Sequence, residues 1–188
     1  KKMIKQINDG DIAEIFEELS NEKTIVVYRL LPKELAAEIF VEMDTDKQEN
    51  LINAFTDNEL KAILDELYYD DTADIIEEMP ATVVKKILKN ASADMRKVVN
   101  ELLKYPEDSA GSIMTTEFVR LRKSFTVQQS LEYIRKVGID KETIYTCYVT
   151  DEKGHLIGIA TAKDLLLASP EKTVEEVMDD HVISVATL

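Results

Sequence analysis

Apolar residues recur every twelve positions through the first hundred residues of the chain. Two registers, one starting at Ile15 and one at Leu19, are apolar at all eight of their positions. The neighbouring register, which starts at Phe16, has the single exception Asn100. Spacings of one and four within each twelve-residue unit place the three positions on one face of a helix. Each unit therefore predicts one short amphipathic helix.

Helix-breaking residues fall between these units at the same step. They are Ser20, Pro32, Asp44, Thr56, Pro80 and Ser92. Serine, threonine and aspartate favour the N-cap position because their side-chain oxygens accept orphan backbone N–H groups. Thr56 and Glu59 also have the spacing of a capping box. A two-turn helix cannot bury its apolar stripe alone, so neighbours must stack. We predict an α-solenoid of about eight short helices over residues 8–104, built from 24-residue helix–turn–helix repeats.

The rest of the chain alternates between strand and helix patterns, in the order β-α-β-β-α. Strands are predicted at 118–122, 144–149 and 156–161, and helices at 127–138, where Thr126 is the N-cap, and at 163–168. Gly154 closes a hairpin turn that begins at Asp151 and needs a positive φ. A further helix from Thr173 and a strand over 182–185 repeat the opening of this pattern, since Val177-Met178 matches Ile113-Met114.

Glycine usage separates the two parts. Of five glycines, only Gly10 lies in the first 110 residues. A chain that turns without glycine is usually helical, whereas hairpins and tight corners need it. We therefore predict an α domain followed by an α/β domain. Their expected bounds are 1–104 for the acidic helical repeat, 105–172 for the α/β domain, and 173–188 for the start of a second, truncated α/β domain.

The net charge of −14 excludes some partners. Phosphate backbones are bound by basic patches, so a nucleic-acid partner is not expected. From Ala62 to Val84 there is no lysine or arginine, and Asp70, Asp74 and Glu78 follow one another at helical spacing. Like charges four apart repel on a helix. Two interpretations stay open: a solvated acidic face, or a site for Mg2+ or Ca2+, which prefer carboxylate oxygens.

Other features indicate a soluble intracellular protein that is not an enzyme. The single cysteine, Cys147, excludes a disulfide framework and is expected to be a buried small residue. No apolar run is long enough to span a bilayer, and the first residues lack the apolar core of a signal peptide. His155 and His181 stand apart from any serine or cysteine nucleophile, so both are expected at the surface.

The segment from Gly158 to Asp164 is a second candidate site. A strand ends there, and Thr161, Lys163 and Asp164 follow at the start of a helix. An aspartate can bind a ribose, and a lysine with a helix N-terminus can bind a phosphate. The alternative is simple capping of the helix by Thr161 or Asp164.

These motifs resemble known families. Residues 112–169 resemble a cystathionine-β-synthase (CBS) domain in their Ile113-Met114 start, their 149–158 hairpin and their Thr161-x-x-Asp164 ending. The helical repeat, followed by Tyr105-Pro-Glu-Asp-Ser-Ala-Gly-Ser-Ile-Met114, resembles the MgtE magnesium transporter family. The resemblance covers essentially the whole chain.

The resemblance implies a function and a set of site residues. Such proteins are homodimeric membrane Mg2+ channels or transporters, paired through CBS domains. Mg2+ between the acidic helical and CBS domains holds the cytosolic part compact and the transmembrane pore closed. The family's Mg2+ ligands fall on Glu38, Asp70 and Asp74, and its contacts to ATP or AMP fall on Thr146, Lys163 and Asp164. The family can have an aromatic residue at Thr146 and arginine at Lys163, so this chain lacks a stacking ring and a planar fork there.

The leading hypothesis is a Mg2+-sensing, gating region on the cytoplasmic side of the cell membrane. The alternative is a CBS-containing regulatory module that senses adenine nucleotides and acts through protein contacts.

Overall fold

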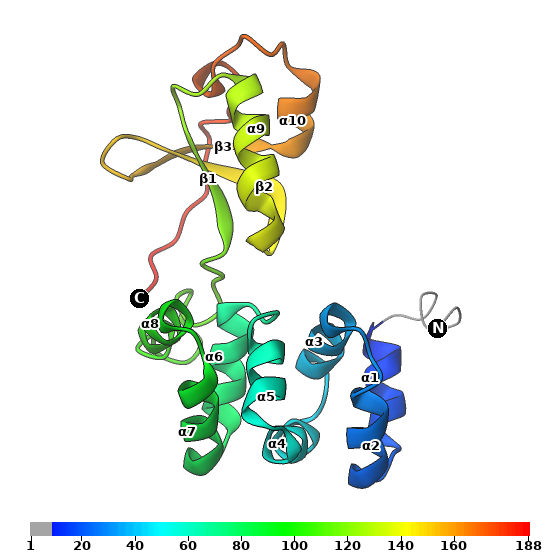
Figure 1. The fold of residues 1–188 in the computed structure, drawn as a ribbon. Helices are drawn as coiled ribbons and strands as arrows, with labels where there is room; N and C mark the ends of the chain where they lie inside the picture. The colour runs from blue at the N-terminus through cyan, green and yellow to red at the C-terminus, as the bar shows by residue number, and fades with distance from the viewer. Residues whose placement is uncertain (1–8) are drawn as a thin grey trace. The chain divides into compact units, whose positions relative to one another are not determined.

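The computed structural model describes residues 9–188 and divides them into two compact units. The first unit runs to Ser112 and the second spans Ile113–Leu188. Each unit has its own fold and is described by itself (Figure 1).

Eight helices make up the first unit, as the twelve-residue pattern predicts. They are α1 (Asp9–Glu17), α2 (Asn21–Tyr28), α3 (Lys33–Val41), α4 (Thr45–Ala54), α5 (Asp57–Leu64), α6 (Tyr69–Glu78), α7 (Ala81–Asn90) and α8 (Ala93–Leu102). Every helix begins twelve residues after the previous one. The period is therefore a structural repeat, and two helices form each 24-residue unit.

Helices one repeat apart pack together. α1 contacts α3, α3 contacts α5 and α5 contacts α7, while α2 contacts α4 and α6 contacts α8. The register from Phe16 supplies an aromatic ladder, because the rings of Phe16 and Phe40 each lie 6.3 Å from that of Tyr28. The buried Tyr28 hydroxyl donates to the carbonyl of Ala36 at 2.7 Å. Burial raises the pKa of Tyr28.

The repeat is less buried at its first helices. In the register from Ile15, the six positions from Ile39 onward are buried, but Ile15 is 52% exposed and Val27 is 39% exposed. The same sequence pattern therefore gives a buried residue in the six helices α3 to α8 and a more exposed one in α1 and α2.

N-cap residues occupy the predicted places but bond differently. Thr56 and Ser92 accept from backbone N–H groups of α5 and α8, and Thr56 with Glu59 forms the predicted capping box. Ser20 and Asp44 stand at N-caps without a side-chain cap bond. The position alone therefore did not decide whether the cap hydrogen bond forms.

Basic side chains bind the carbonyl ends of helices in this unit. Lys86 on α7 donates to the carbonyls of Ile52, Asn53 and Phe55, at 2.6, 3.2 and 2.7 Å. Lys47 donates to the Leu19 carbonyl beyond α1, and Arg96 to the Ala91 carbonyl beyond α7. Cations suit these ends because the helix dipole leaves partial negative charge there.

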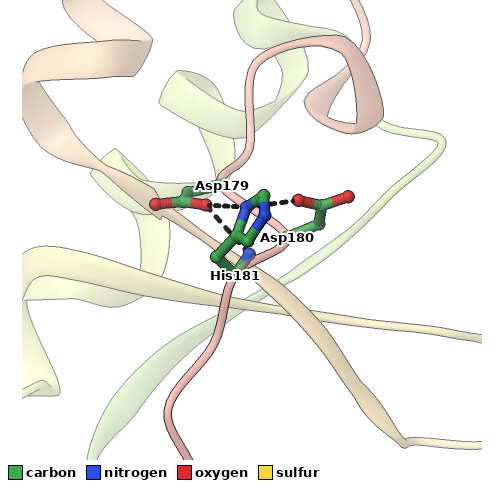
Figure 2. Close-up of side chains that lie close together, drawn as sticks. All are labelled: Asp179, Asp180 and His181. Carbon is green, nitrogen blue, oxygen red and sulfur yellow. Dashed lines mark hydrogen bonds and ion pairs between the residues drawn. The ribbon is translucent and has the colours of Figure 1, made fainter.

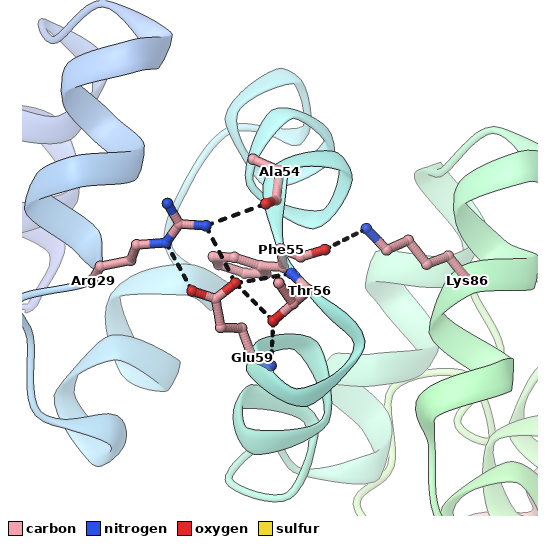
Figure 3. Close-up of polar contacts among 6 residues, drawn as sticks. All are labelled: Arg29, Ala54, Phe55, Thr56, Glu59 and Lys86. Atoms are coloured by element: carbon pink, nitrogen blue, oxygen red, sulfur yellow. Dashed lines mark hydrogen bonds and ion pairs between the residues drawn. The ribbon is translucent and has the colours of Figure 1, made fainter.

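Arg29 extends the same pattern and adds an ion pair (Figure 3). Its guanidinium donates to both carboxylate oxygens of Glu59, at 2.8 and 3.2 Å, and to the Ala54 carbonyl at 3.3 Å. Hydrogen bonds from Thr56, reinforced by Arg29, lower the pKa of Glu59 to about 2. Lys47, Lys86, Arg96 and Arg29 thus bind groups within the fold, whereas many carboxylates of this unit face solvent.

The second unit is a three-stranded sheet covered on one face by two helices. It contains β1 (Phe118–Arg122), α9 (Val127–Val137), β2 (Thr143–Thr150), β3 (Leu156–Thr161) and α10 (Ala162–Leu167). β1 pairs with β2 in parallel, and β2 pairs with β3 antiparallel. Buried residues on alternate strand positions pack against α9 and α10, and they include Val119, Leu121, Cys147, Val149 and Ala160. The predicted β-α-β-β-α order is confirmed.

Local details of this unit follow the sequence. Thr126 forms a capping box with Gln129 at the start of α9. Gly154 has φ +87° in the turn between β2 and β3, so a side chain there would be strained. Cys147 is buried, and burial raises the pKa of its thiol to about 11, as expected for an inert core residue.

The strand predicted over residues 182–185 was wrong. The chain forms a 3₁₀ turn at Val174–Glu176 and then has no regular structure beyond the bridge between Ile159 and Asp179. Ile183 is 97% exposed. A β-strand needs a hydrogen-bonding neighbour, and none of the described residues pairs with this segment.

Candidate functional site

Carboxylates line the solvent side of α6. The helix buries Thr72, Ala73, Ile75 and Ile76, which leaves its acids on the opposite side. Asp70 is half-buried and Asp74 is exposed. Partial burial, and then repulsion from Glu78 one turn later, raise the pKa of Asp74. Desolvation and the charge of Glu78 therefore disfavour the ionised form of Asp74, and a nearby opposite charge would relieve this.

Glu38 lies apart from these acids in the sequence, on α3. It is exposed between the buried Ala37 and Ile39, on the flank of its helix. Glu38, Asp70 and Asp74 do not converge on one point in the structure: over residues 9–188, the three-residue group with ligand atoms within 4.8 Å of one another is a different one. Their role as Mg2+ ligands stays a prediction.

That group is Asp179, Asp180 and His181, near the end of the chain (Figure 2). The His181 Nδ1 lies 2.9 Å from Asp180 Oδ1 and 3.4 Å from Asp179 Oδ1. All three side chains are exposed, and His155 is exposed too, as predicted for both histidines. His181 was predicted only to be a surface residue, and the two aspartates that precede it were the signal for this cluster. Carboxylate and imidazole can ligate a divalent cation, but here they already satisfy one another.

The residues predicted to contact a nucleotide lie at one end of the sheet. Thr146 on β2 pairs directly with Thr161 on β3, and Lys163 and Asp164 follow on α10. Asp164 Oδ2 accepts from the Thr161 N–H at 3.0 Å, and the Asp164 N–H donates to Thr161 Oγ1 at 3.1 Å. The Thr161 hydroxyl also donates to Asp164 Oδ2, and this bond, together with that from the Thr161 N–H, lowers the pKa of Asp164. Asp164 Oδ2 is therefore used in capping the start of α10, as the alternative interpretation predicted. The lowered pKa also means that Asp164 is ionised at neutral pH.

Comparison with known proteins finds a matching family for each part of the chain. The MgtE intracellular N domain family matches residues 7–108, and the CBS domain family matches residues 110–171. The first match covers more than half of the chain. The chain belongs to the MgtE family. The predicted fold class, a helical repeat followed by a CBS domain, is confirmed, as is the resemblance on which it partly rested.

Individual MgtE relatives are similar along the whole chain. The magnesium transporter MgtE of Thermus thermophilus is 35% identical over 191 residues, and that of Bacillus subtilis is 27% identical over 188 residues. Both alignments cover 100% of this chain but 42% of the relative, so the chain spans about two fifths of these proteins.

A solved structure agrees with these matches. A crystal structure of the cytosolic domain of the Mg2+ channel MgtE in complex with ATP superposes with a TM-score of 0.90 and 35% identity, covering 99% of this chain and 76% of that one. None of the helices over residues 9–188 combines the length and apolar character needed to cross a membrane. The MgtE relatives are named as transporters or channels, a class distinct from enzymes.

Proposed function

We propose that this chain is the Mg2+-sensing and gating region of an MgtE magnesium transporter, on the cytoplasmic side of the membrane. In the full-length homodimer, CBS domains join the subunits and a transmembrane domain forms the pore. Mg2+ bound between acidic helical and CBS surfaces favours the closed state. When Mg2+ is scarce, like charges repel and the open state gains population.

The observation that carries this proposal is the run of acids on α6, in a stretch of sequence without basic residues. Lysine and arginine are absent from Ala62 to Val84, and Lys47, Lys86 and Arg96 elsewhere in the helical unit bind helix ends. The raised pKa of Asp74 indicates that its charge is unfavourable where it stands. A hard divalent cation stabilises such a carboxylate, and Mg2+ commonly uses one or two carboxylates while keeping several waters.

Glu38, Asp70 and Asp74 are the proposed helical-domain ligands. They need not meet one another, because each can share a Mg2+ with an acid from another part of the full-length protein. The relatives are more than twice as long as this chain, which leaves room for such acids.

Small-angle scattering of the chain against MgCl2, with KCl of equal ionic strength as reference, tests this function. We expect Mg2+ to reduce the radius of gyration beyond the effect of KCl, and Asp70→Asn/Asp74→Asn to weaken that response. The matched control is Glu14→Gln/Glu18→Gln, which also removes two acids four residues apart. Equal Mg2+ and KCl curves, or equal responses in both double variants, would contradict a specific sensor.

Nucleotide sensing is a second candidate function, because the MgtE cytosolic domain in the matched crystal structure binds ATP. Thr146, Lys163 and Asp164 are the proposed contacts here. Titration calorimetry with ATP and with AMP tests them: Lys163→Ala should weaken binding, whereas Lys172→Ala, an exposed lysine elsewhere in the same unit, should not. Binding that survives Lys163→Ala and Asp164→Asn unchanged would exclude this assignment.

A further inference from the structure

A cavity of about 610 Å³ lies at the hairpin end of the sheet unit. It is bordered by the end of β1, the loop that follows it, α9 and the turn between β2 and β3. Its lining residues with charged or aromatic side chains are Arg120, Arg122, Lys123, Phe125, Tyr133, Asp151, Glu152 and Lys153. This volume is in the range of small-molecule sites, roughly 300–1,000 Å³.

Two arginines reach the cavity from a single strand. Arg120 and Arg122 alternate on β1 with the buried Val119 and Leu121, so both emerge on the exposed face of the sheet. No hydrogen bond or ion pair within residues 9–188 engages either guanidinium. In the helical unit, by contrast, Arg29 and Arg96 both bind protein oxygens. The two strand arginines are therefore available to an external acceptor.

The acids around the cavity offset these charges only in part. Asp151 turns back into the hairpin, where Oδ1 accepts from the backbone of Lys153 at 2.9 Å and of His155 at 2.8 Å, and Oδ2 lies 2.9 Å from His155 Nδ1. These hydrogen bonds lower the pKa of Asp151. Lys123 is held by Glu175, outside the lining, at 2.9 Å. The lining thus carries four basic side chains, Arg120, Arg122, Lys123 and Lys153, against two carboxylates, Asp151 and Glu152, in a chain whose net charge is −14.

An aromatic pair forms part of the wall. The rings of Phe125 and Tyr133 meet edge to face with centroids 6.1 Å apart, and Tyr133 is 37% exposed. The cavity wall therefore has an apolar part as well as a charged one. We propose that this cavity binds a small anion that carries phosphate groups, with Arg120 and Arg122 as the principal contacts. Guanidinium suits this role because its planar fork bonds two phosphate oxygens at once.

The cavity is separate from the proposed nucleotide contacts. Thr150, which lines the cavity, pairs with Leu156 at the start of β3, whereas Thr146 pairs with Thr161 at the end of β3. The two places thus lie at opposite ends of the same hairpin. Binding here would be independent of Lys163 and Asp164.

Calorimetry of the full chain with inorganic pyrophosphate, in buffer without Mg2+, tests the proposal. We expect binding that Arg120→Gln/Arg122→Gln weakens about tenfold or more. Arg135→Gln/Lys136→Gln removes the same charge from exposed positions on α9 outside the cavity and should leave the affinity within about twofold. Lys153→Gln, in the exposed turn, should reduce the affinity by an intermediate amount. This variant tests the proposal if the arginine variant does not fold.

Three results would overturn this inference. One is no detectable heat with pyrophosphate at millimolar concentration. Another is equal affinity in the wild-type chain and in the folded arginine variant. The third is an equal loss in the arginine and control variants, which would assign the binding to diffuse charge.

Discussion

Four basic residues of the helical unit and two arginines of the sheet unit are used in opposite ways. In the helical unit, Arg29, Lys47, Lys86 and Arg96 bind the carbonyl ends of helices. In the sheet unit, Arg120 and Arg122 border a cavity and bind no protein group over residues 9–188. A cation used inside the fold leaves an acidic exterior, which attracts cations. A cation left outside creates a place for anions. Net charge alone does not distinguish these cases.

The largest expected effect on stability comes from removing a cation that binds the carbonyl end of a helix. Lys86→Met removes an ammonium that bonds three carbonyls near the end of α4. We expect a loss of about 2 kcal/mol in the free energy of unfolding, as for hydrogen bonds to a charged group. Urea denaturation followed by far-ultraviolet circular dichroism measures it. Lys85→Met, at an exposed neighbouring position on α7, should change little. Equal losses would mean that helix charge, rather than these bonds, matters.

Glycine gives a second contrast between the units. Gly154→Ala should destabilise the hairpin by about 1 kcal/mol, because φ is +87° there and the site offers open space but no relief of backbone strain. Gly10→Ala, within α1, should instead stabilise its helix by a few tenths of a kcal/mol. Hydrogen exchange of peptides over residues 143–161 and 9–17 measures both. The same sign at both positions would contradict the contrast.

Glu59, which accepts hydrogen bonds from Thr56 and forms an ion pair with Arg29, predicts a pH dependence in the helical unit. The pKa of Glu59 falls from its ordinary value of 4.5 to about 2 on folding. Its stabilising contribution is therefore present above the ordinary value and is lost as pH falls toward about 2. Glu59→Gln should cost about 0.5 kcal/mol at neutral pH, since the pair is exposed. Denaturation midpoints of both proteins should converge in acid, and a constant difference would contradict this account.

Asp74 is expected to have a smaller effect on stability, opposite in sign to that of Glu59. Its pKa is raised above the ordinary 3.8, so its ionisation destabilises the fold as pH rises through the raised value. Asp74→Asn should stabilise the chain at neutral pH by about 0.3 kcal/mol, the size of a like-charge pair on a helix. Thermal melting without Mg2+ measures it, and the gain should vanish below the ordinary pKa. A destabilised variant would mean that Asp74 makes a structural bond.

Much of the fold could be predicted from the sequence because its determinants are local. Helix starts follow the twelve-residue pattern, and the capping boxes at Thr56 and Thr126 depend on residues three apart. Tertiary determinants could not be read in this way. Lys86 binds carbonyls more than thirty residues away, and Ile15 has the same pattern as the buried Ile39 but is exposed.

The candidate sites show the same difference between local and tertiary determinants. Asp70 and Asp74 stand out in the sequence because their spacing puts them on one helix, and the structure confirms that placement. Their ligand role depends on groups elsewhere, which spacing cannot reveal. The cavity at Arg120 and Arg122 was missed because the hairpin turn and α9 reach it only after folding. The alternation of β1, which sends both arginines to one face, was the one signal available beforehand.

The regular row of helices has a consequence for how the first unit opens. In a repeat array, each helix is held mainly by its neighbours, so opening proceeds from an end rather than all at once. The α1–α2 end, with Ile15 and Leu30 exposed, should exchange its amide hydrogens first, whereas the inner helices α4 and α5 should exchange last. The free energy of local opening should therefore rise from the α1–α2 end toward the inner helices.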